Sequence, residues 1–260
     1  MSHKRNTGLF LLIFIVLAVF FVFQSCSLKQ TLYIDRNGAG SVSFNLELAP
    51  YFADVTEQLS DLSPRESSNN KTDKKKGLFD LAKIKEDFSR SKGTVVEELE
   101  SPSGDILKGK LTFTNITTAL NSGLNSGLNS GTSSNIGNIF NFSSNGEERT
   151  LSVLLDYNTV EKFLAVNPSM DSPLMQTFGP LANKGLTDSD YLDMMQFALG
   201  DESREGIKDS YLILDVNVDG VITAQKGGTL IDTDTVQFKI PLLRILILDE
   251  PQSFYVSFRK

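Results

Sequence analysis

The sequence predicts an α+β fold whose mostly antiparallel sheet is made from hairpins at the N- and C-terminal ends of the chain. Strand-like alternation of apolar residues occurs in runs toward both ends, whereas helical spacing gathers in the middle. Strands and helices do not alternate regularly, as they would in a parallel sheet. We therefore expect one domain over residues 26–260, with the helices from the middle packed on one face of the sheet.

The first element is a hairpin in "LYIDRNGAGSVSFNLEL", with its turn at Asn37–Gly38. The apolar residues that share a face of its second strand are Val42, Phe44, Leu46 and Leu48. A helix is expected to begin at Pro50, because the first turn of a helix does not need the missing N–H. The polar stretch at residues 63–77 then predicts a mobile insertion.

A short helix is predicted for "LFDLAKIKEDF", ending before Gly93. The next segment reads as a hairpin that turns between Ser101 and Gly104. It is followed by "NSGLNSGLNSG", a repeat far shorter than the period of a solenoid. We interpret residues 121–133 as a second mobile insertion, with a binding loop as the alternative.

The middle of the chain continues with the strands "NIFNF" and "RTLSVLLDY" and then with helical patterns. The spacing of Asn158 and Glu161 predicts a capping box at the start of one helix. The best-delimited helix is "TDSDYLDMMQFALG", with Thr187 as its N-cap, Asp190 in its first turn and Gly200 after its last turn.

The C-terminal part returns to strands. "SYLILDVNVDGVITAQ" predicts a hairpin that turns at Asp219–Gly220, and "GTLIDTDTVQFKI" and "SFYVSFRK" supply further strands. Between the last two lies the apolar insert "PLLRILILDEP".

Composition excludes several kinds of chemistry. The only histidine is His3 and the only cysteine is Cys26, so a chain that begins at Cys26 lacks the residues for Ser-His-Asp, Cys-His and imidazole metal sites. The net charge of −7 becomes −9 when residues 1–25 are removed, because this segment contains Lys4 and Arg5 and no acidic residue. Such an acidic chain does not favour nucleic-acid binding. No pattern calls for a cofactor.

The N-terminus has the pattern of an export signal. Lys4 and Arg5 precede an apolar run over residues 8–23, which stops at "QSC". The segment resembles a bacterial lipoprotein signal with a relaxed, spirochaete-type lipobox, in which Ser25 fits the usual small residue and Gln24 departs from the pattern. The resemblance implies cleavage between Ser25 and Cys26, with diacylglycerol on the thiol and a further acyl chain such as palmitate. An uncleaved transmembrane anchor and a structural or reactive thiol are the alternatives.

This signal segment predicts a protein attached to a membrane of the bacterial cell envelope, such as one facing the periplasm. It does not distinguish the inner from the outer membrane. Only about five residues separate Cys26 from the predicted strand at Leu32, and they span at most ~17 Å. We therefore expect the domain to lie on the membrane surface. Acyl chains would hold it there, since the mature chain is acidic.

Two further groups are candidate sites. Asp215, Asn217 and Asp219 match the start of a calcium loop, but Lys226 stands where the bidentate glutamate belongs, so we favour a hairpin over a metal site. Methionines and phenylalanines gather in the helical middle, where they predict either ordinary core or a lipid groove. These residues are Met170, Met175, Phe178, Met194, Met195 and Phe197.

The opening "DRNGAGSVSFNLEL" and the closing "VNVDGVITAQKGGTLIDTDTVQFKIPL" are similar to the hairpins of LppM-type lipoprotein domains, over about a fifth of the chain. That resemblance implies a role that faces lipid or the envelope. The leading hypothesis is a non-enzymatic lipoprotein that binds a lipid or an envelope protein. The alternative is a hydrolase of the cell envelope that uses Ser or Asp/Glu without histidine.

Overall fold

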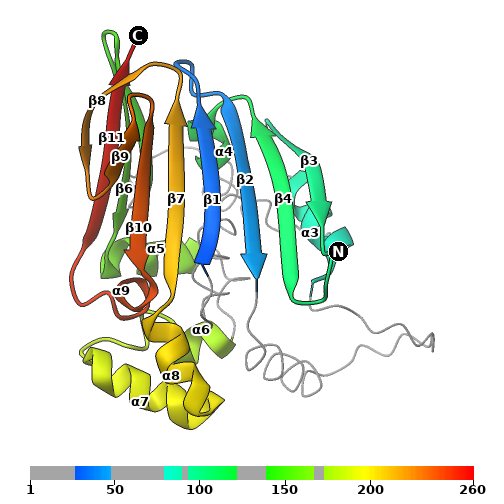
Figure 1. Cartoon of the computed structure of the whole chain (residues 1–260), viewed down its shortest axis with the longest axis vertical. Coiled ribbons are helices and arrows are strands. Elements are labelled where there is room, and N and C mark those ends of the chain that lie inside the picture. The colour runs from blue at the N-terminus through cyan, green and yellow to red at the C-terminus, as the bar shows by residue number, and fades with distance from the viewer. Residues whose placement is uncertain (1–26, 48–78, 90–92, 122–138, 167–172) are drawn as a thin grey trace.

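The computed structural model describes residues 27–47, 79–89, 93–121, 139–166 and 173–260 (Figure 1). Within these residues the chain forms two β-sheets and several short helices. Eight of the nine strand pairings described are antiparallel. The predicted α+β class with mostly antiparallel strands is confirmed.

The larger sheet has seven strands in the order β3-β4-β2-β1-β7-β10-β9. Its strands are β1 (Ser27–Ile34), β2 (Gly40–Glu47), β3 (Thr94–Glu100), β4 (Ile106–Phe113), β7 (Tyr211–Val218), β9 (Thr229–Asp232) and β10 (Thr235–Pro241). The first strand of the described residues, β1, therefore lies at the centre of the sheet. There it pairs antiparallel with β2 and parallel with β7, from Ser27 opposite Tyr211 to Ile34 opposite Val218.

The smaller sheet has four strands in the order β5-β6-β11-β8. Its strands are β5 (Phe140–Asn145), β6 (Glu148–Leu155), β8 (Val221–Lys226) and β11 (Gln252–Arg259). The C-terminal strand β11 lies between β6 and β8 and pairs antiparallel with both.

The helices are short. They are α3 (Leu81–Ser89), α4 (Ile116–Asn121), α5 (Tyr157–Val166), α6 (Pro173–Phe178), α7 (Asp188–Leu199), α8 (Asp201–Lys208) and α9 (Leu242–Ile247). Helices α6, α7, α8 and α9 gather at the end of the larger sheet where β7 begins (Figure 1). The apolar insert seen in the sequence is α9, and five of its six side chains are buried.

Both faces of the larger sheet follow the alternation in the sequence. On β7 the side chains of Leu212, Val216 and Val218 are buried, whereas those of Asp215 and Asn217 are half-buried. Pairs of polar side chains cover the outer face, because this face of the sheet is in contact with solvent. Asp215 Oδ2, for example, lies 3.5 Å from Lys29 Nζ.

Several local predictions are confirmed. Strands β1 and β2 form the expected hairpin, with Gly38 at a φ of 80° and Asp35 Oδ1 accepting hydrogen bonds from the backbone N–H groups of Asn37 and Ala39. Strands β3 and β4 form the second hairpin. Thr187 is the N-cap of helix α7, and Asp190 completes a capping box with it.

The predicted hairpin at Asp219–Gly220 is wrong. Strand β7 belongs to the larger sheet and β8 to the smaller, so these two residues carry the chain from one sheet to the other. Gly220 also lacks the positive φ that a type I′ turn requires. Alternation predicts which face a side chain occupies, but it does not predict which strand its neighbour is.

Two other details differ from prediction. The capping hydrogen bonds at α5 join Asp156 and Thr159, with Asp156 Oδ1 accepting from the Thr159 N–H at 2.7 Å, in place of Asn158 and Glu161. The inner face of the larger sheet is shared between helices and a second sheet. Helix α3 contacts it through Phe88, whose ring centroid lies 6.4 Å from that of Phe44.

Some predicted segments lie outside the described residues. These are the signal segment 1–25 with Cys26, the helix expected from Pro50, the insertion at 63–77 and nearly all of the insertion at 121–133.

Candidate functional site: an apolar cavity between the sheets

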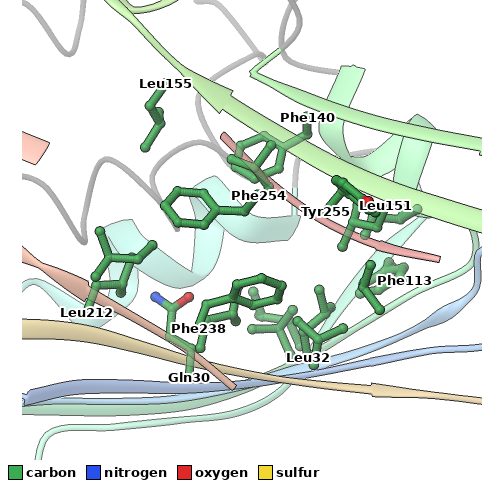
Figure 2. Close-up of a pocket in the computed structure, with 18 of the residues that line it drawn as sticks. Gln30, Leu32, Phe113, Phe140, Leu151, Leu155, Leu212, Phe238, Phe254 and Tyr255 are labelled. Carbon is green, nitrogen blue, oxygen red and sulfur yellow. The ribbon is translucent and has the colours of Figure 1, made fainter. Parts of the chain in front are cut away.

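The two sheets enclose an apolar cavity of about 90 Å³. Figure 2 shows side chains from both sheets pointing toward one another across it. The larger sheet contributes inward-facing residues of β1, β2, β4, β7 and β10, including Leu32, Val42, Leu111, Leu212, Val216 and Phe238. The smaller sheet contributes those of β5, β6 and β11, including Phe140, Leu151, Val153, Leu155, Phe254 and Val256.

Two phenylalanines of the cavity lining, one from each sheet, contact one another. Phe238 on β10 and Phe254 on β11 meet edge to face, with ring centroids 5.8 Å apart. Such a contact adds about 0.5–1.5 kcal/mol to the burial of the rings. The contact joins the two sheets within the lining of the cavity.

The length of the cavity follows from the strand geometry. On β7 it runs from Leu212 through Leu214 to Val216, which is a rise of about 13 Å along the strand. A narrow, elongated and apolar space of this kind suits a hydrocarbon chain better than a compact polar metabolite.

Three polar residues interrupt the apolar lining. They are Gln30 on β1, Thr94 at the start of β3 and Tyr255 on β11. Gln30 and Thr94 are buried, with 5% and 9% of their surface exposed. No charged side chain lines the cavity among the described residues, so the lining offers no carboxylate pair and no lysine for acid–base chemistry.

The predicted methionine and phenylalanine group does not line this cavity in the part of the chain that the structure describes. Met195 is fully buried in α7, Met194 and Phe178 are half-buried, and Phe197 is 96% exposed. Met175 lies in α6, and Met170 lies outside the described residues. The helices that carry them lie at one end of the larger sheet (Figure 1).

The three candidate metal ligands have other partners. Besides Lys29, Asp215 accepts a hydrogen bond from Gln237 at 2.8 Å. Asn217 Oδ1 accepts one from the Thr235 hydroxyl at 2.7 Å.

Asp219 Oδ2 lies 3.3 Å from Arg36 Nε. Among the described residues, no group of three or more histidine, cysteine, aspartate or glutamate side chains is arranged to hold a metal ion.

Cys26 and Ser25 lie outside the described residues, and the first residue described after them is Ser27 at the start of β1. Within the described part of the chain, no helix is both long and apolar enough to cross a bilayer.

The sequence did not predict the cavity, because its lining comes from nine strands in two sheets. The available signal was polarity at inward positions: Gln30 alternates with Leu28 and Leu32, and Thr94 alternates with Val96. A polar residue on the buried face of a strand needs a local explanation.

Comparison with known proteins finds a structural similarity but no sequence match. No family model matches the chain, and no curated protein matches it. A similar solved structure is the NMR structure of the folded domain of LppM from Mycobacterium tuberculosis. It has a TM-score of 0.39 and 13% sequence identity, over 92% of each chain. A similarity this low carries no inference about function.

Proposed function

We propose that the chain is an acyl-anchored lipoprotein of the bacterial cell envelope whose domain binds an apolar, lipid-like ligand between its two sheets without catalysing a reaction. The cavity is the observation that supports the proposal of an apolar ligand. Its walls are apolar, it runs along the strands, and no charged side chain lines it among the described residues. Filling such a space with hydrocarbon is favourable by roughly 0.8 kcal/mol for each buried methylene group.

The lipobox-like "QSC" supports the anchor. Ser27 is already paired with Tyr211 in the larger sheet, so the domain begins one residue after the proposed lipid carrier, Cys26. Acyl chains on Cys26 would then hold this end of the sheet against a membrane. The domain would meet lipid at close range, in keeping with an apolar ligand.

Lipid binding is tested by native mass spectrometry and by titration with a fluorescent fatty-acyl probe. Val153 lines the cavity, and Val153→Phe is expected to fill it and to weaken probe binding by tenfold or more. Val95→Phe is the matched control, because Val95 is 60% exposed on the outer face of β3. Equal binding by wild type and both variants would contradict the cavity as the site, and no binding by wild type would contradict the function.

The anchor is tested separately by the intact mass of the protein purified from membranes. The expected product lacks residues 1–25 and carries acyl mass on Cys26. Cys26→Ala should stop this processing. An unchanged product from the variant would refute the lipoprotein assignment and leave the cavity hypothesis standing.

A further inference from the structure

The hydroxyl of Thr94 is the unusual group in the cavity. The residue is 9% exposed, and its Oγ1 is buried with no hydrogen-bond partner among the residues that the structure describes. A buried hydroxyl that makes no hydrogen bond destabilises a protein, because it has lost its bonds to water and gained none. Native proteins rarely keep such a group without a reason.

The backbone fixes where this hydroxyl lies. Gly93 precedes it at a φ of 75°, which glycine adopts readily, and its carbonyl accepts a hydrogen bond from Thr114 N at 2.8 Å. Thr94 then pairs with Phe113 on β4, while the next residue, Val95, turns outward to solvent. The strand pleat therefore holds the Thr94 side chain on the inner face, in the cavity wall.

The character of the lining limits the ligand further. An ionised carboxylate in an apolar space without a cationic partner is strongly disfavoured. Because the described lining has no lysine or arginine, a free fatty acid in its charged form fits poorly. A neutral oxygen, such as the carbonyl of an ester or the hydroxyl of an alcohol, can accept the hydrogen bond of Thr94 at no such cost.

We infer that the ligand is a neutral single-chain amphiphile, such as an acyl ester or a fatty alcohol, whose oxygen accepts a hydrogen bond from Thr94 Oγ1. This inference rests on the proposed function, since it needs the cavity to hold a hydrocarbon chain. It specifies the chemical class of the ligand and identifies Thr94 as the residue that binds its polar end.

The test compares four probes of equal chain length that are supplied from cyclodextrin and compete with the fluorescent acyl probe for the full-length protein. They are methyl laurate, lauryl alcohol, laurate and dodecane. In wild type, the ester and the alcohol should bind about 2- to 10-fold more tightly than dodecane, as one neutral hydrogen bond provides. Laurate at neutral pH should bind more weakly than its methyl ester.

Thr94→Val removes the hydroxyl and keeps the shape of the side chain. It should bring the ratio of ester to dodecane affinity to about one, leave the affinity for dodecane unchanged, and raise the melting temperature of the free protein. Thr94→Ser is the control, because it keeps the hydroxyl and should preserve the ratio.

A ratio that is unchanged in Thr94→Val, or laurate binding as tightly as its ester, would overturn this inference alone. If none of the probes binds wild type, the proposed function falls with it. If Thr94→Val fails to fold, loss of the ratio in Thr94→Ala serves the same purpose, with Thr94→Ser as the reference.

Discussion

The space between the sheets can be measured by adding one methylene group to each of two neighbouring valines. Val216 and Val236 are opposite each other on β7 and β10, and both are fully buried. Val216 lines the cavity, whereas Val236 does not. Val236 is packed closely, since a Cβ added at Gly228 would come within 2.6 Å of its methyl group.

Val216→Ile should therefore stabilise the protein by about 0.8 kcal/mol, the value of one buried methylene group that meets no clash. For a chain of this length the melting temperature should rise by roughly 2–3 °C. Val236→Ile should instead lower the free energy of unfolding by about 1–3 kcal/mol through overpacking. Both substitutions keep a β-branched residue in a strand, so strand propensity does not explain a difference.

The assay is urea and thermal unfolding of the two variants beside wild type. If Val216→Ile is destabilised as much as Val236→Ile, the side chains around Val216 leave no space, and the reasoning that leads from the cavity to a ligand is refuted.

Three further predictions concern stability. Asn183→Ala should lower the free energy of unfolding by about 1–3 kcal/mol in urea titrations, because its amide donates to two backbone carbonyls, one of them at Leu246; a loss below 0.5 kcal/mol would show that these bonds matter little. Gly93→Ala should lower the melting temperature, since its φ is 75° and its new Cβ would meet the Thr114 hydroxyl. Hydrogen bonds from the Thr187 hydroxyl and backbone N–H lower the pKa of Asp190, so the support this carboxylate gives to α7 should be present above pH 3.8 and be lost as the pH falls below that value; Thr187→Ala removes the hydroxyl bond and keeps the backbone bond, so it should reduce this acid-dependent part, as helicity followed against pH would show.

Elements with local signals were predictable from the sequence. The turn at Asn37–Gly38 and the helix from Thr187 to Gly200 each have their start and stop residues within a few positions, and both formed as expected. Local hydrogen-bonding groups determine such elements, so the residues of the segment itself are enough to predict them.

What depended on distant partners was not predictable. Asp219–Gly220 has the composition of a hairpin turn, yet β8 pairs with β11 in the smaller sheet and not with β7. The cavity could not be predicted from the sequence, because its lining residues are also distant from one another along the chain. Thr94 and Val153 are far apart in sequence, and only the packing of two sheets makes them walls of one cavity.

The central place of β1 has a consequence for the timing of folding. The strand is made first, but its parallel partner β7 is made only when the ribosome reaches residues 211–218. Until then one edge of β1 has no partner in the sheet, and the cavity lacks the walls that β7, β10 and β11 supply. Contacts so distant in sequence form slowly, and an open strand edge invites pairing with other chains in the meantime. The cavity can therefore be completed only when synthesis is nearly finished.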